Sequence, residues 1–423
     1  MLRLLFFCLF LFICCPPAGA TGAVVRKISI SGPITPVVAG YLQRNLQEAE
    51  AGRENLVLIT MDTPGGLDSA MRDSVKLIMS STIPVVVYVA PSGARAASAG
   101  AVIALAADIC AMAPGTNIGA AHPVTMGEKP DKVMMDKVVN DAEAYLEGIA
   151  AKRGKNVKLA GQMVRESLSL SADKALDGKI IDMISADQAQ LLAELHGLSL
   201  IRDGKKLVIE TAGAEVRGHE MVAKERILNV ISNPNVAYVL MMLGFLGIFF
   251  ELSNPGVMLP GIVGGISLIL AFFALQALPV NYAGVLLLLL ALVLFIAEIK
   301  IISHGMLTVG GVICLVLGSL FLFESSEPYL RVSWSVITVT VLATTVFFVS
   351  AVALSIKAHR KKPLTGIAGL IGERGTAETD LNHEGKVFVH GEYWQASSDS
   401  PVRKGEEVAV VAVEGMRLKV KKA

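Results

Sequence analysis

The sequence predicts three parts with different folds: an α/β domain, then an α-helical multi-span membrane domain, then a small all-β barrel. Residues 21–230 alternate short β-type runs with helical stretches, residues 236–357 carry almost no charge, and residues 364–423 are short alternating runs between turn residues. Hydrophobic residues make up 53% of the 423 and charged residues only 18%, which excludes a disordered protein and an ordinary soluble enzyme. The net charge of +1 gives no support for a nucleic-acid partner.

Residues 1–20 have the pattern of a secretory signal peptide. Arg3 supplies a positive charge, residues 4–15 are apolar, and Ala18-Gly19-Ala20 is a small-x-small cleavage pattern. An apolar run of about 12 residues is short against the roughly 20 that a spanning helix needs. We therefore expect cleavage after Ala20, with an uncleaved anchor helix as the alternative.

The α/β domain is predicted from repeated strand–helix–strand units. Such repeats favour a largely parallel sheet with right-handed crossovers. Strands are expected over residues 24–31, 55–61, 84–90 and 109–113, and helices over 35–51, 67–80, 98–107 and 134–151. Cys110, within the last of these strands, is expected to be a small buried apolar residue.

Five hydrophobic runs predict the membrane domain. Several are only 17 to 19 residues long, which leaves four spans as the alternative. With residues 21–230 exported, five spans place the C-terminus inside, and the Lys and Arg residues at 357 and 360–362 agree with the positive-inside rule. The runs cover residues 236–252, 257–278, 283–299, 305–323 and 334–356.

The last part, residues 364–423, predicts about five strands. Its length of roughly 60 residues fits a five-stranded barrel of OB type. Tyr393 and Trp394 are candidates for a stacking platform, but a role in the core or in a protein contact is favoured over nucleic acid.

Two motifs in the α/β domain point to nucleophilic catalysis. Asp62-Thr63-Pro64-Gly65-Gly66 follows a strand, and two glycines allow a sharp turn with outward N–H groups, as an oxyanion hole requires. About 32 residues later, Ser98 opens a helix among Gly and Ala residues, a position that can expose its Oγ. Each motif alone also fits a plain structural role, an ordinary turn or a helix N-cap. Their combination is more specific.

With these motifs, the run AASAGAVIALAADICAMAPGTNIGAAHPV, the five hydrophobic runs and GEYWQAS near the C-terminus, the chain resembles the long form of the NfeD family. The resemblance implies a membrane-bound serine protease of the ClpP class. The resemblance implies a ClpP/crotonase-type fold for residues 21–230 and an NfeD-type OB domain at the end. It also implies Ser98 as the nucleophile, and an oxyanion hole from the Gly66 (or Gly65) N–H with the Ala99 N–H.

The resemblance further implies a Ser-Lys dyad, and Lys137 is the expected base. Its spacing to Asn140 and Tyr145 in one helix matches the family pattern. A lysine removes a proton only when it is neutral, so we expect this side chain to be desolvated. The competing lysines are Lys129, Lys132 and Lys152.

His122 is the alternative base, because it follows Ser98 by 24 residues, close to where Clp peptidases place their histidine. A triad also needs an acid to orient the imidazole. The matching position is about Ser167, and Glu166 is expected to point elsewhere, so a structural role for His122 is favoured. Asp62 is expected to organise its turn rather than to act as an acid.

The resemblance thus implies an integral-membrane endopeptidase with its Ser98 site on the extracytoplasmic (periplasmic) side of the cell membrane and its OB domain in the cytoplasm. Its implied substrates are hydrophobic peptide segments, such as the C-terminal region of a stomatin-like (SPFH) partner, and a homo-oligomer is expected. No metal, nucleotide or other cofactor is implied. The alternative is a non-enzymatic membrane scaffold that docks a stomatin-like protein through its OB domain.

Overall fold

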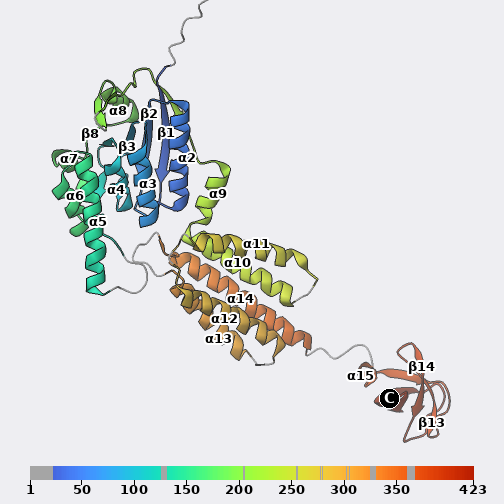
Figure 1. The fold of residues 1–423 in the computed structure, drawn as a ribbon. Helices are drawn as coiled ribbons and strands as arrows, with labels where there is room; N and C mark the ends of the chain where they lie inside the picture. The colour runs from blue at the N-terminus through green and yellow to red at the C-terminus, as the bar shows by residue number, and fades with distance from the viewer. Residues whose placement is uncertain are drawn as a thin grey trace, which may run out of the picture. The chain divides into compact units, whose positions relative to one another are not determined.

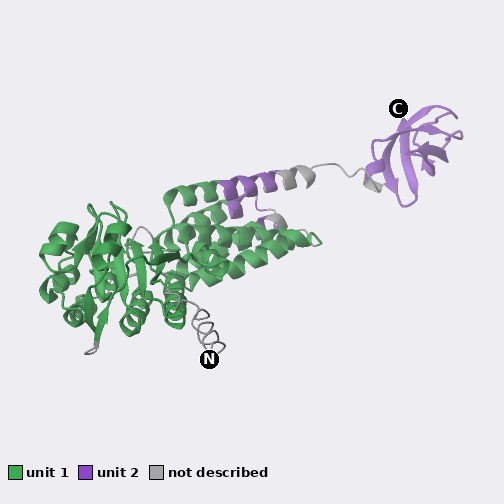
Figure 2. Cartoon of the chain, turned by 90° about the horizontal axis from the view of Figure 1, so that it is seen from above, with its two compact units in different colours: residues 1–296, 309–342 green, residues 297–308, 343–423 purple. Residues whose placement is uncertain are grey.

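The structure is a computed structural model that describes residues 22–124, 131–202, 205–253, 256–276, 278, 280–301, 303, 305–323, 330–359 and 367–423. The expected signal peptide, residues 1–20, lies outside this range. The chain divides into two compact units, Met1–Ile296 with Val309–Leu342 and Ala297–Thr308 with Ala343–Ala423, which Figure 2 colours separately.

A six-stranded sheet forms the centre of the α/β domain (Figure 1). Its strand order is β11-β1-β2-β3-β5-β8, and every neighbouring pair is parallel. The parallel sheet predicted from the sequence is therefore confirmed, and the predicted strand over residues 24–31 matches β1. The strands are β1 (Val24–Ser31), β2 (Leu56–Asp62), β3 (Val85–Val89), β5 (Ile109–Met112), β8 (Met183–Ile184) and β11 (Glu215–Gly218).

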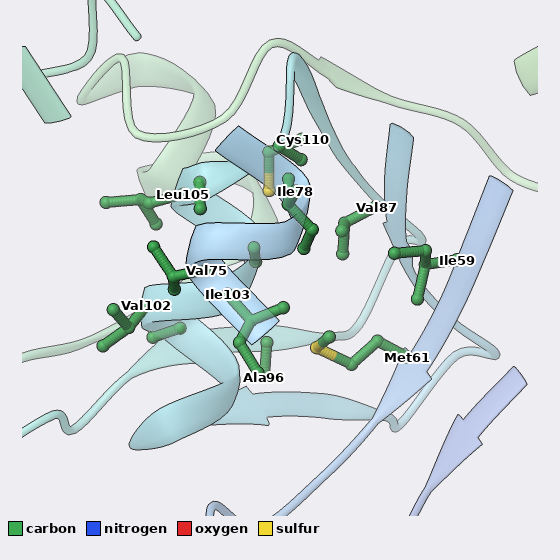
Figure 3. Close-up of a cluster of buried hydrophobic side chains, with 14 of the residues drawn as sticks. Ile59, Met61, Val75, Ile78, Val87, Ala96, Val102, Ile103, Leu105 and Cys110 are labelled. Carbon is green, nitrogen blue, oxygen red and sulfur yellow. The ribbon is translucent and has the colours of Figure 1, made fainter. Parts of the chain in front are cut away.

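The two faces of this sheet belong to two different cores, because successive side chains of a strand point to opposite sides. Ile59, Met61 and Val87 face one core, in which side chains of α3 and α4 pack against them (Figure 3). Leu58 and Val86 face the other core, which α8 (Gln188–Leu195) covers. The first core is built with α2 (Pro36–Gly52), α3 (Asp68–Ser80) and α4 (Ala99–Ala106).

Cys110 lies in the first core and is fully buried. Burial raises the pKa of its thiol to about 12, so the residue is a neutral, apolar part of the core. The sequence-based expectation for this residue is confirmed.

A second sheet of three short strands lies in the segments that carry the serine motif. Strand β4 (Arg95–Ala97) pairs in parallel with β6 (Asn117–Gly119), which pairs antiparallel with β7 (Ser169–Ser171). The sequence did not predict these strands, because three residues are too few to show a period.

The remaining helices of the α/β domain are α5 (Lys132–Lys152), α6 (Val157–Arg165), α7 (Ala172–Asp177) and α9 (Ala223–Ile231). Strands β9 (Ser199–Arg202) and β10 (Lys205–Val208) form a separate antiparallel pair. In Figure 1 the first turns of α5 extend beyond the rest of the domain. Val133 and Met134 in these turns are 66% and 51% exposed, so this part of α5 is poorly covered.

Five apolar helices follow in the described residues: α10 (Pro234–Ser253), α11 (Met258–Leu275), α12 (Tyr282–Lys300), α13 (Met306–Phe321) and α14 (Trp334–His359). Three of them, α10, α11 and α14, are long and apolar enough to cross a membrane, while the apolar stretches of α12 and α13 are shorter. A Cβ on Gly247 of α10 would come within 2.6 Å of the Gly264 Cα on α11. Small residues thus let these two helices pack closely, as in membrane proteins.

The C-terminal domain is a closed barrel of five strands in the order β12-β13-β14-β16-β15. Its interior is apolar, and Trp394 packs partly against it, whereas Tyr393 is 69% exposed. The predicted OB-type barrel is confirmed. The strands are β12 (Arg374–Ala377), β13 (Glu384–Val389), β14 (Glu392–Ser397), β15 (Glu407–Glu414) and β16 (Arg417–Lys422).

Candidate active site

The turn after β2 requires both of its glycines. Gly65 has a φ of 123°, a conformation that L side chains rarely adopt. A Cβ on Gly66 would lie 2.2 Å from the Ile34 carbonyl oxygen, so no larger residue fits there. Asp62 accepts a hydrogen bond from the Arg95 N–H at 3.1 Å, which ties the turn to β4 and agrees with its expected organising role.

Ser98 occupies a strained junction between β4 and α4. Its φ of 52° and ψ of −120° are unusual for a residue with a side chain, and such strain is concentrated at functional sites. The Ser98 N–H donates to the Gly119 carbonyl oxygen at 2.9 Å, which holds the strained backbone in place. Ser98 is the N-cap residue of α4, as the structural alternative expects, but its side chain makes no capping hydrogen bond to the helix.

The small residues around Ser98 let α4 approach the glycine turn. A Cβ on Gly100 would lie 2.3 Å from the Thr63 Cγ2. Thr63 is fully buried, and its Oγ1 accepts the Gly65 N–H at 3.1 Å. The two motifs that lie about 32 residues apart in the sequence are therefore in direct contact.

A cavity of about 460 Å³ opens beside this junction, and Gly66, Ser98, Ala99 and Lys137 all line it. The structure thus brings together four residues that the sequence singled out. Most of the other lining side chains are apolar or aromatic, and they include Met71, Val102, Val138, Tyr145 and Val164. Such a pocket suits an apolar side chain of an extended peptide.

The backbone donors around the cavity differ in availability. The Gly65 N–H is used by Thr63, and Gly65 is not among the residues that line the cavity. Within the described part of the chain, neither the Gly66 N–H nor the Ala99 N–H donates to another protein group. Of the two glycines expected from the sequence, Gly66 is therefore the one that lines the cavity and whose N–H is not used within the described residues.

Lys137 lies in the second turn of α5 and is exposed, which differs from the expected desolvated lysine. Val133 and Met134, in the turns of α5 before it, are also largely exposed, so this part of the helix is poorly covered. Within the described residues Lys137 makes no hydrogen bond to Ser98. Lys132 and Lys152, at the two ends of α5, do not line the cavity, and Lys129 lies outside the described residues.

The His122 ring is bound by a backbone carbonyl group. Its Nδ1 lies 2.8 Å from the Val164 carbonyl oxygen, to which it donates, and the residue does not line the cavity. Glu166 accepts a hydrogen bond from Gln162 at 3.2 Å instead of orienting the imidazole. In the part of the chain that the structure describes, no carboxylate binds His122.

A charged cluster that the sequence did not reveal lies at the cavity. Arg72 of α3 donates to Asp68 at 2.9 Å and to Asp141 of α5 at 2.6 Å, and its guanidinium lies 4.4 Å from the ring centre of Tyr145. Burial lowers the pKa of Arg72, but the hydrogen bonds to Asp141 and Asp68 together raise it above its ordinary value. Burial also raises the pKa of the Tyr145 phenol, an effect that Arg72 partly offsets. Only the Asp68–Arg72 spacing of four residues was visible in the sequence.

Groups of three or more His, Cys, Asp or Glu side chains that could hold a metal ion are absent among the described residues.

Three family models match the chain in sequence order. The NfeD1b N-terminal domain matches residues 24–198, the NfeD integral membrane domain residues 235–353, and the NfeD-like C-terminal, partner-binding domain residues 367–422.

Two curated relatives are similar over nearly the full length. Membrane-bound protease PH1510 of Pyrococcus horikoshii is 35% identical over 409 residues, which covers 93% of this chain and 92% of the relative. Membrane protein NfeD1b of Bacillus subtilis is 29% identical over 425 residues, which covers 96% and 94%.

Solved structures are similar to part of the chain. A variant of the Pyrococcus horikoshii stomatin-specific protease fragment 1510-N, in complex with a substrate peptide, is 32% identical and covers 50% of this chain and 98% of the fragment, with a TM-score of 0.46. ClpP1 from Listeria monocytogenes is 20% identical and covers 39% of this chain and 94% of its own, with a TM-score of 0.33.

The order of the three family models agrees with the order of the three folds, and the PH1510 relative extends through all of them. The chain therefore belongs to the NfeD family of membrane proteins.

Proposed function

We propose that this protein is a membrane-bound serine endopeptidase that uses Ser98 as its nucleophile and Lys137 as its base. The proposal rests on Ser98, which has a strained backbone and a side chain that makes no capping hydrogen bond. Ser98 lines a cavity together with Gly66, Ala99 and Lys137. The names of similar proteins support it, since PH1510 is named a membrane-bound protease and the 1510-N fragment a stomatin-specific protease.

In the proposed mechanism the Ser98 Oγ attacks the carbonyl carbon of the scissile peptide bond, and its proton passes to Lys137. The negative charge that develops on the carbonyl oxygen is stabilised by the Gly66 and Ala99 N–H groups. The C–N bond then breaks, Lys137 gives the proton to the leaving amine, and an acyl-enzyme on Ser98 remains. Water, deprotonated by Lys137, hydrolyses this ester and restores Ser98.

Because Lys137 is exposed in the free chain, we propose that substrate binding completes the site. A lysine is a base only in its neutral form, and removal from water favours that form. A peptide in the apolar cavity would cover Lys137 and Val138 together. The substrate itself would then complete the desolvation that the unliganded chain lacks.

The proposed substrates are hydrophobic peptide segments, because the cavity is lined mainly by apolar side chains. A stomatin-like (SPFH) protein is the proposed partner, since the 1510-N fragment is named stomatin-specific and the barrel matches a partner-binding domain. We place the protease domain outside the cytoplasm and the barrel inside, in a homo-oligomer. The same barrel match favours a second, compatible function, in which the chain docks this partner as a scaffold.

The test uses the full-length chain in detergent and a fluorophosphonate probe, which labels activated serines. We expect labelling of the wild type and of Ser80→Ala, a control whose hydroxyl bonds only to Leu77 at the end of α3. Ser98→Ala should not be labelled. A fluorogenic apolar peptide should likewise be cleaved by the wild type and by Ser80→Ala, but not by Ser98→Ala. Labelling that persists in Ser98→Ala, or a folded wild type that neither reacts nor cleaves, would leave the scaffold function.

A further inference from the structure

Arg72 binds both carboxylates that line the cavity. Asp68 and Asp141 are the acidic residues among the lining side chains, and each bonds to the same guanidinium. Arg72 is fixed in turn by the ring of Tyr145 below it. The cluster joins α3, which begins two residues after Gly66, to α5, which carries Lys137.

Asp141 follows Lys137 by four residues on α5. Side chains at this spacing are neighbours on a helix surface, and a lysine and an aspartate there form an ion pair. A carboxylate bound to the Lys137 ammonium would hold the lysine in its protonated form. The proposed base and the carboxylate one helical turn after it are therefore in conflict, unless another cation binds the carboxylate.

We infer that Arg72 is a positioning residue that holds Asp141, and with it Asp68, away from Lys137, so that Lys137 is free to take the Ser98 proton. This inference rests on the proposed function. Arg72 suits the task because its planar fork donates to two carboxylates at once and keeps its charge at any working pH. Its hydrogen bonds in the described residues go to Asp68 and Asp141, and none goes to Ser98.

The other charged and titratable groups near Lys137 are also accounted for. Glu143 of α5 is bound by Arg165 of α6 and is not a cavity residue. The His122 ring is held at Val164, and the Tyr145 phenol keeps its proton because burial raises its pKa. Asp136, next to Lys137, does not line the cavity. Asp141 is the carboxylate that the loss of Arg72 would release one helical turn from the base.

The experiment measures the pH dependence of fluorophosphonate labelling by the full-length chain in detergent. In Arg72→Gln the released Asp141 should stabilise protonated Lys137, so the rising, low-pH part (the low-pH limb) of the rate profile should shift to higher pH by about half a unit. At a given pH in that part, the rate should fall about threefold. The shift should shrink when the salt concentration rises from about 0.1 M to 1 M, because salt screens exposed ion pairs. The double variant Arg72→Gln with Asp141→Asn should have its low-pH limb at the wild-type position again, although Arg72 is missing.

Arg165→Gln is the matched control, because it releases Glu143 of the same helix outside the cavity. It should leave the limb unmoved. If Arg72→Gln lowers the rate equally at every pH, or if Asp141→Asn does not restore the limb, Arg72 has only a structural role and the inference fails. Should Arg72→Gln not fold, Arg72→Lys should give a smaller shift that Asp141→Asn also removes.

Ser98→Ala, run in parallel, separates the two failures. Labelling that survives in Ser98→Ala overturns the proposed function itself. Labelling that depends on Ser98 but shows no shift in Arg72→Gln overturns the role of Arg72 alone.

Discussion

The candidate site has two sides that are built in different ways: the nucleophile side, which carries the proposed nucleophile Ser98, and the base side, which carries the proposed base Lys137. Gly66, Ser98 and Ala99 lie on backbone that buried contacts fix, with Ala99 only 6% exposed. Lys137 lies on turns of α5 whose neighbours Val133 and Met134 are largely exposed. The comparison teaches that one half of this site is complete in the free chain, while the other half depends on surface ion pairs and on what occupies the cavity.

Substitution of Lys137 on the base side should lower the labelling rate strongly and change the free energy of unfolding little. Lys137→Ala should reduce the fluorophosphonate labelling rate by about 10²- to 10⁴-fold, the range for loss of a general base. Its exposure means that the free energy of unfolding should change by less than about 0.5 kcal/mol. Labelling rate and apparent melting temperature of the full-length chain check both parts, with Lys132→Ala as the matched lysine control. An equal loss in both variants would mean that α5 carries no specific base.

Substitution of Gly66 on the nucleophile side should lower both the labelling rate and the free energy of unfolding. Gly66→Ala places a Cβ 2.2 Å from the Ile34 carbonyl oxygen, so the turn that holds the oxyanion donor must shift. We expect a loss of about 10²- to 10³-fold in rate and about 1–3 kcal/mol in stability.

The matched glycine is Gly148, which lies inside α5 and has open space where a Cβ would stand. Gly148→Ala should raise stability by about 0.5–1 kcal/mol and leave the rate unchanged. A Gly66→Ala chain that melts and reacts like the wild type would contradict the rigid, preformed nucleophile side.

His122→Ala sharpens the assignment of the base. Since the imidazole bonds to the Val164 carbonyl and does not line the cavity, the labelling rate should stay within about threefold of the wild type. The bond joins the segment after β6 to the end of α6, so a net loss of about 1 kcal/mol in stability is expected. A rate loss as large as that of Lys137→Ala would instead favour His122 as the base of a catalytic triad.

The smallest effect concerns Cys110 in the core under the site. Its pKa is about 12 in the folded chain against an ordinary 9.0, so above pH 9 the unfolded chain loses a proton that the folded chain keeps. The stability from the neutral thiol is therefore present below pH 9 and is lost as the pH rises towards 12. The apparent melting temperature of Cys110→Ala should fall less steeply between about pH 9 and 11 than that of the wild type. Parallel slopes would contradict the buried thiol.

The sequence predicted the nucleophile side better than the base side. β1 and the turn at Gly65 and Gly66 were readable because local patterning and glycine requirements determine them. The short strands β4 and β6, which hold Ser98, were not, because their pairing is tertiary. The bond from Arg72 to Asp141 joins residues 69 positions apart, and no local pattern reports such a contact. The exposure of Lys137 likewise depends on how far α5 extends from the domain.

The positive φ of Ser98 also bears on how this chain can change by mutation. At such a backbone position glycine is preferred over any L side chain by roughly 1 kcal/mol. A lineage that no longer needed the hydroxyl would gain stability by drifting to glycine at position 98. The serine in this chain goes against that preference. Under the proposed function, the residue at position 98 then separates active from inactive descendants of this fold.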